Sequence, residues 1–235
     1  MFLAAHPCKL RPQYDPNTNF TDYTVEDIAE VNSAISLIAG DAIHNLRSAL
    51  DHLAASLVRD AGNTPSKQTY FPICQSPAHY VAESPGKIKG MRKTDIARID
   101  LLKPYLRGED RLWGLHRMDI TDKHDLILTQ TQCVGGVNYR ISEADTVETM
   151  GGINIFGRTP STDKKIVTVP LFGQFPTPEK GKVLVRFPGN TEKDEDDRFS
   201  FDIAFGDVQV FKGRLVLPSL RELANLVQGI VDSFK

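Results

Sequence analysis

The stretch GDAIHNLRSALDHL, residues 40–53, carries the strongest structural signal in the sequence. Successive residues of an α-helix are about 100° apart, so the aliphatic side chains at positions 43, 46, 50 and 53 share one face. The rest of the helix surface is mostly polar: Asp41, His44, Asn45, Arg47, Ser48, Asp51 and His52. The pattern predicts a two-sided helix whose aliphatic face enters the core.

The types of polar residue on this helix suggest more than solubility. A merely solvated face usually carries Lys, Glu and Gln, which are good helix formers, whereas Asp, Asn, Ser and His are poorer ones. We therefore interpret the polar face as a functional site or a buried polar network. An ordinary solvated face, with Arg47 and Asp51 as an ion pair at i,i+4 spacing, stays open as the alternative.

The surrounding sequence predicts further helices in the first half of the chain. Thr24 resembles an N-terminal cap and Gly62 a stop, so a long helical segment is expected between them. Residues 63–90 are rich in proline and predict a long ordered loop, in which the FPI segment at 71–73 packs against the core. Two shorter helices are expected at about 93–106 and 109–121.

The second half of the chain predicts a sheet. From about residue 126, β-branched or alternating segments are separated by Gly, Pro or Asn, a pattern typical of an antiparallel meander. Residues 218–234 predict a last helix, with Ser219 and Glu222 as a capping box. We therefore expect an α+β fold in one compact unit. Residues 1–125 would form a helical part with the polar site, and residues 126–235 an antiparallel sheet closed by the C-terminal helix.

Composition argues against several classes of protein. The 235 residues carry a formal net charge of −2, so no global basic field indicates a nucleic-acid binder. No run of about 18 apolar residues predicts a membrane span, and the N-terminus lacks a secretory pattern. Cys8, Cys74 and Cys133 are odd in number and lack metal-ligand spacing. We therefore expect free thiols and a cytoplasmic protein.

A second polar cluster lies in LWGLHRMDITDKHDLIL, residues 112–128. His116 and Asp119 share a helix face at i,i+3 spacing, and the tripeptide 122–124 comes where we expect this helix to give way to a strand. Four of the six histidines lie in the two clusters. We expect both clusters to converge on one water-accessible pocket.

These segments resemble a group of bacterial and phage proteins. The shared features are a helix of the form G-D-x-x-H-N-L-R-S-A-L-D-H-L, the FPI segment and a later D-K-H, all within about the first 130 residues. This resemblance implies a family but no activity.

The run from Arg47 to His52 also resembles the R-x(4–6)-H motif of the HEPN superfamily. Many HEPN proteins are helical, metal-independent ribonucleases or nucleic-acid-binding parts of toxin and defence systems. The resemblance implies that Arg47 holds the scissile phosphate, that His52 is the general acid or base at a ribose 2′-hydroxyl, and that two subunits form a homodimer. The sheet predicted for the second half departs from the HEPN pattern.

We therefore predict a hydrolase, in the first place an HEPN-like endoribonuclease that cleaves RNA without a cofactor. Such cleavage needs a base with a near-neutral pKa, a cation for the phosphoryl oxygens and an acid for the leaving group. The predicted catalytic residues are Arg47, His52, His44, Asp51, His116, Asp122 and His124. The predicted substrate-binding residues are Asn45, Ser48 and Lys123.

Two other hypotheses stay open. A metal-dependent hydrolase of a small ester, amide or phosphate would hold a divalent metal with Asp41, His44, His116, Asp119 and His124. A non-enzymatic binding or defence-system module would use both clusters as a buried network, with Arg47–Asp51 and Asp122–His52 as its pairs. Nucleophilic mechanisms rank lower because the sequence has no G-x-S-x-G elbow.

Overall fold

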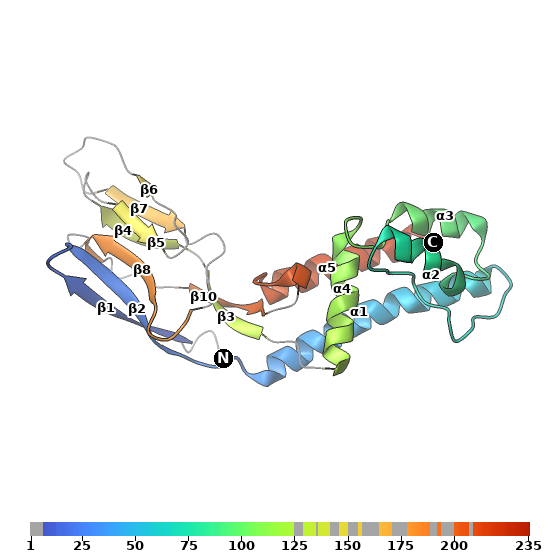
Figure 1. The fold of residues 1–235 in the computed structure, drawn as a ribbon, viewed down its shortest axis with the longest axis horizontal. Coiled ribbons are helices and arrows are strands. Elements are labelled where there is room, and N and C mark those ends of the chain that lie inside the picture. Colours follow the sequence, from blue (N-terminus) through green and yellow to red (C-terminus); the bar gives the residue numbers. More distant parts are fainter. Residues whose placement is uncertain are drawn as a thin grey trace. The chain divides into compact units, whose positions relative to one another are not determined.

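The computed structural model describes residues 7–124, 129–134, 136–141, 146–149, 155–156, 165–170, 178–188, 192–193, 200–206 and 209–235 (Figure 1). The fold is α+β, as the sequence predicted. The chain forms two compact units, one from Met1–Asn32 with Gln130–Ala204 and one from Ser33–Thr129 with Phe205–Lys235. Each unit combines two separate stretches of chain, which differs from the expected consecutive parts 1–125 and 126–235.

The first unit contains the sheets. A five-stranded sheet has the order β1-β2-β8-β5-β6, a three-stranded sheet the order β7-β4-β9, and β10 pairs with β3. Neighbouring strands in the first two sheets run antiparallel. The strands are β1 Cys8–Asp15, β2 Phe20–Ile28, β3 Thr129–Val134, β4 Gly136–Ile141, β5 Thr146–Thr149, β6 Ile155–Phe156, β7 Lys165–Pro170, β8 Val183–Pro188, β9 Glu192–Lys193 and β10 Ser200–Phe205. The order is not that of a simple meander, because β2 pairs with the distant β8.

The N-terminal hairpin corrects the prediction of a helix that begins near Thr24. Tyr23 and Val25 in β2 are buried, with exposed fractions of 6% and 1%, and this two-residue alternation is that of a strand. The turn before β2 is stabilised by Asp15, whose carboxylate accepts the amide of Asn17 at 2.9 Å and the hydroxyl of Thr18 at 3.1 Å. The helix begins only at Ser33.

The second unit is helical and contains the polar residues discussed below. Its helices are α1 Ser33–Asp60, α2 Pro77–Lys87, α3 Lys93–Leu101, α4 Asp110–His124, the short 3₁₀ turn η2 Gln209–Phe211 and α5 Val216–Ser233. Helix α1 contacts both α4 and α5 (Figure 1). Gly114 lets η2 approach α4, because a Cβ at this position would overlap the ring of Phe211. Full burial of α1 side chains such as Ile43 and Leu50 contributes roughly 1.5–3 kcal/mol each.

Several element boundaries differ from the sequence predictions. The expected loop at 63–90 contains α2, in which Ser76 caps the first turn by accepting the amide of His79. Helix α4 extends to His124, so the tripeptide 122–124 is helical instead of marking a turn. Helix α5 starts at Val216, which puts Ser219 inside the helix and not at a capping position. The FPI segment is buried as expected, with Phe71 fully enclosed.

Two further predictions concern bulk properties. No helix in the described part of the chain combines the length and apolar character that crossing a bilayer requires. Cys8 and Cys74 are free and buried.

Candidate functional site

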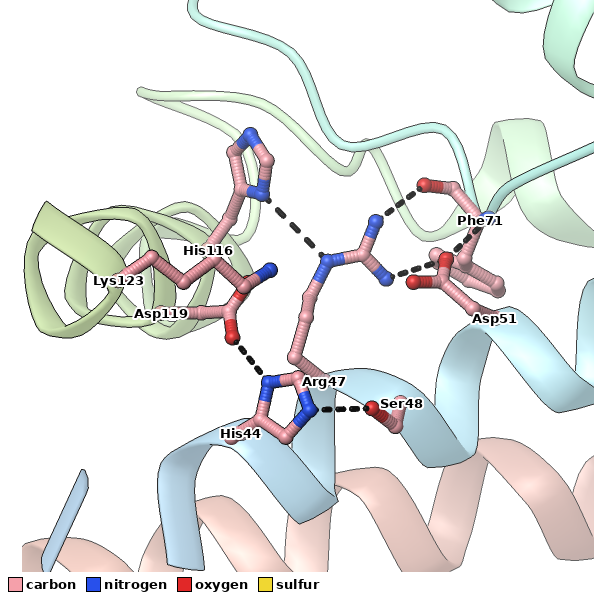
Figure 2. A network of polar contacts seen from close by, with 8 residues as sticks. All are labelled: His44, Arg47, Ser48, Asp51, Phe71, His116, Asp119 and Lys123. Carbon is pink, nitrogen blue, oxygen red and sulfur yellow. Dashed lines mark hydrogen bonds and ion pairs between the residues drawn. The ribbon is translucent and has the colours of Figure 1, made fainter. Parts of the chain in front are cut away.

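Arg47 and Asp51 of α1 hold the backbone of Phe71 (Figure 2). The Arg47 guanidinium donates to Asp51 Oδ1 at 2.8 Å and to the Phe71 carbonyl at 3.0 Å. Asp51 Oδ1 in turn accepts the Phe71 amide at 2.9 Å. A single ion pair thus satisfies both polar groups of a buried residue, which would otherwise be costly to bury.

The burial of Arg47 corrects the helical-wheel prediction, which placed this residue with the polar face. Arg47 is only 6% exposed. Seven of the nine buried positions of α1, namely 36, 40, 43, 47, 50, 54 and 57, are alternately four and three residues apart, and the other two are Ala39 and Val58. This spacing marks the core-facing stripe of a helix. Arg47 occupies a core position in that stripe, and its spacing from Ile43 and Leu50 was the available sequence signal.

His44, Asp119 and Lys123 form a second group, at the surface of the same pair of helices. His44 Nδ1 lies 2.9 Å from Asp119 Oδ1, and Lys123 Nζ lies 2.7 Å from Asp119 Oδ2. The Asp119 side chain is 4% exposed, whereas those of His44 and Lys123 are 52% and 51% exposed. Burial opposes ionisation of Asp119, but the hydrogen bonds from Lys123 and His44 outweigh it and hold the pKa of this carboxyl below its usual range.

Ser48 completes a chain of three side chains. An ionised carboxylate only accepts hydrogen bonds, so the His44 Nδ1–H must donate to Asp119. In a neutral imidazole this leaves Nε2 as an acceptor, and Ser48 Oγ lies 3.5 Å from it, one helical turn further along α1. The distance is long for a hydrogen bond, as it often is in catalytic sites without substrate. Figure 2 shows the order hydroxyl, imidazole, carboxylate.

His116 lies between the two groups and is neutral. Its Nδ1 accepts from Arg47 Nε at 3.4 Å, which requires an unprotonated Nδ1. Burial, followed by the nearby positive charge of Arg47, lowers the pKa of His116 to about 4. The ring also packs against Trp113, with the two ring centroids 5.9 Å apart. His116 is therefore a neutral acceptor for Arg47 at physiological pH.

Gly40 lets the last turn of α4 approach α1. A Cβ at Gly40 would overlap the carboxylate of Asp122, so this carboxylate lies directly against the backbone of α1. Gly40 precedes His52 by twelve residues, or about 18 Å along a helix. The expected Asp122–His52 pair is therefore wrong, whereas the expected Arg47–Asp51 pair is present.

The remaining predicted site residues lie apart from these contacts. Asp41, Asn45 and His52 are exposed or partly exposed on α1, and their side chains have no hydrogen bond or ion pair to any residue that the structure describes. The His124 side chain lies outside the described residues. The two sequence clusters do meet, but through the residues His44, Arg47, His116 and Asp119.

The expected metal set is not assembled within the described side chains. There, no three His, Cys, Asp or Glu side chains have an arrangement that could hold a metal ion. His44 and Asp119 are in contact, with Nδ1 of the imidazole hydrogen-bonded to Oδ1 of the carboxylate.

The sequence indicated Ser48, His44 and Asp119 in separate roles and did not connect them. The sequence carries only a weak signal that these three residues act together, because Asp119 is 75 residues from His44 and local motifs do not reach that far. Comparisons with protein-family models, with curated proteins and with solved structures find no significant match to this chain. The geometry of the site is therefore the basis for a functional proposal.

Proposed function

We propose that this protein is a hydrolase in which Ser48 is the nucleophile, His44 the general base and Asp119 the group that orients the imidazole. One observation carries the proposal: a buried carboxylate fixes Nδ1 of a half-exposed histidine whose other nitrogen faces a serine hydroxyl. This arrangement of nucleophile, base and orienting acid is recognised by geometry and not by sequence order. The substrate class it favours is a carboxylic ester or amide.

The proposed reaction balances without a metal or a cofactor. Ser48 Oγ attacks the carbonyl carbon of the substrate while its proton moves to His44 Nε2, which gives a tetrahedral intermediate. The carbon–leaving-group bond then breaks, and His44 returns the proton to the leaving alcohol or amine. Water, deprotonated by His44, hydrolyses the Ser48 ester, and Ser48 recovers its proton. Asp119 stays ionised throughout and stabilises the imidazolium.

We propose that the side-chain amide of Asn45 stabilises the negative charge of the intermediate. Asn45 is exposed and precedes Ser48 by three positions, which puts both on the same helix face. A donor to the developing oxyanion is usually worth a factor of about 10²–10³ in rate.

The ribonuclease predicted from the HEPN resemblance uses different groups and is less well supported. Its cation, Arg47, is buried and donates to Asp51, Phe71 and His116. Binding a phosphate through Arg47 would require breaking these bonds. RNA cleavage and homodimer formation remain predictions from the resemblance.

A serine-directed probe tests the proposal without knowledge of the substrate. The full chain is incubated with an alkyl fluorophosphonate, in which an activated serine displaces fluoride from phosphorus. Intact mass and peptide mapping then locate the adduct. We expect a single adduct on Ser48, and none in Ser48→Ala or His44→Gln.

Matched controls separate activation from simple accessibility. Ser56→Ala removes another serine of α1, two turns beyond Ser48, and His52→Gln removes an exposed imidazole of the same helix. Both variants should label at the wild-type rate. No adduct on Ser48, or an adduct that forms equally fast in folded His44→Gln, would overturn the proposal.

A further inference from the structure

A groove at the far end of α1 has no role in the proposed chemistry. It has a volume of about 530 Å³ and lies between the loop after α1 and the turn between α2 and α3. Lys67 and Lys89 lie on its two walls, with the side chains of Thr64 and Ser66 on the loop side. Every lining residue is Lys, Gly, Asn, Gln, Ser or Thr, so the groove has no carboxylate and no aliphatic wall.

The two groove lysines lack counter-charges in the described part of the structure. Neither Lys67 nor Lys89 forms an ion pair with a described carboxylate. The neighbouring Lys87 differs, since it pairs with Glu83 at 2.8 Å. Two lysines without a described ion-pair partner line one polar groove, and their charges give it a local positive potential in a chain of formal net charge −2.

The lysines are not needed to cap the helix that ends beside them. The last four carbonyls of α1 are already satisfied: Leu57 by the amide of Ala61, Val58 by that of Asn63, Arg59 by that of Gly62 and Asp60 by the Arg92 side chain. Such groups otherwise attract cationic side chains to the end of a helix. Lys67 and Lys89 therefore have no role in capping α1.

The groove is held in shape before any ligand arrives. Asn63 Nδ2 donates to the carbonyl of Gly90 at 2.9 Å, which ties the two walls together. Gly90 has a φ of +93°, and a Cβ there would lie 3.3 Å from both Asn63 and Val58. On the loop, Ser66 Oγ accepts the amide of Gln68 at 3.1 Å. A preformed site loses little conformational entropy when it binds.

We propose that this groove binds the phosphate group of an anionic ligand, with Lys67 and Lys89 as its cationic contacts and Thr64 as a hydroxyl donor. A phosphate fits these features because it carries up to two charges and accepts several hydrogen bonds at once. The site is separate from Ser48, which lies on α1 roughly three turns before its end. The phosphate can belong to a small monoester or to the backbone of a single-stranded nucleic acid.

The experiment uses the full chain and two probes, ribose 5-phosphate and a fluorescent oligouridine. Binding is measured by calorimetry for the first and by anisotropy for the second, at 50 and 200 mM salt. We expect at least one probe to bind, and Lys67→Met/Lys89→Met to weaken it at least tenfold. For the oligouridine, this double variant should also lower the slope of log affinity against log salt concentration, by up to about 0.7 for each phosphate that the lysines neutralise.

A second double variant is the control for charge. Lys93→Met/Lys103→Met removes the same charge from exposed positions of the same unit outside the groove, and should bind as the wild type does. Binding of the monoester alone identifies a small ligand, and binding of the oligouridine alone identifies a nucleic-acid backbone. Binding of neither probe, or equal weakening in both double variants, would overturn the proposal. Ser48→Ala should bind normally, so this test does not depend on the proposed hydrolase.

Discussion

Arg47 and Phe71 are joined across 24 residues by a hydrogen bond of 3.0 Å from the guanidinium to the backbone carbonyl. Asp51 reinforces the contact by accepting the Phe71 amide. Arg47, the first residue of the HEPN-like motif, therefore helps to hold the FPI segment against α1.

Arg47→Met should destabilise the protein instead of affecting only its activity. The substitution leaves the Asp51 carboxylate and the Phe71 carbonyl without their partner, and such a change costs about 2–4 kcal/mol. In a chain of this size this corresponds to a fall in Tm of roughly 5–15 °C. His52→Ala, at an exposed position, should stay within about 0.5 kcal/mol of the wild type. An Arg47→Met protein as stable as the wild type would contradict the packing role.

Gly40→Ala should also destabilise, because its methyl group would overlap the Asp122 carboxylate. The Asp122 carboxylate would have to turn away from α1 and lose its present interaction, which we expect to cost about 1–3 kcal/mol, more than the gain in helix propensity. Gly229→Ala in α5 is the matched control, since a Cβ there meets no atom within 4 Å. The control should be stabilised by roughly 0.5–1 kcal/mol. Urea unfolding of both variants measures the change in the free energy of unfolding, which should be negative for Gly40→Ala and positive for Gly229→Ala. Changes of the same sign would contradict the close approach of Asp122 to Gly40.

His116 should make stability depend on pH in the acid range. Burial lowers the pKa of His116 from 6.5 to about 4. Between pH 6.5 and pH 4, His116 is therefore protonated in the unfolded chain but not in the folded one. The contribution of neutral His116 to the free energy of unfolding is therefore complete above about pH 6.5. It falls by roughly 3 kcal/mol at most as the pH is lowered toward 4.

The measurement compares urea midpoints of the wild type and His116→Gln from pH 7.5 to 4.5. The glutamine carbonyl can still accept from Arg47 but does not titrate, so the variant should lose less stability on acidification. Titration of the His116 ring signals by NMR provides an independent check. A midpoint near 6.5 would show that the ring is not desolvated.

Asp119→Asn should slow labelling of Ser48 by the fluorophosphonate at least a hundredfold. The amide can present a donor to His44, which favours the imidazole tautomer with its proton on Nε2 and removes the acceptor for Ser48. Lys123→Met removes the other partner of Asp119 but keeps the carboxylate, so it should slow labelling much less. Equal rates in wild type and folded Asp119→Asn would mean that the carboxylate does not orient the base.

Dialysis against a chelator should leave the labelling rate unchanged, because every proposed step uses a side chain. The alternative metal site shares His44 and Asp119 with the proposed mechanism. Loss of labelling that added Zn²⁺ or Mn²⁺ restores would favour that alternative.

The amino-acid sequence by itself determined the two-sided helix around residues 40–53, the α+β class and the two polar clusters, because each depends on local periodicity and residue type. The spacing of Arg47 from Ile43 and Leu50 allowed a core position, but only the tertiary structure decided that Arg47 is buried, because a buried guanidinium needs the partners that Phe71 and Asp51 supply. The same holds for β2, whose short alternating pattern becomes a strand through pairing with β1 and β8. The contact between His44 and Asp119 likewise depends on how closely α4 packs on α1 at Gly40. Such packing is set by residues far apart in the chain, and local sequence patterns do not encode it.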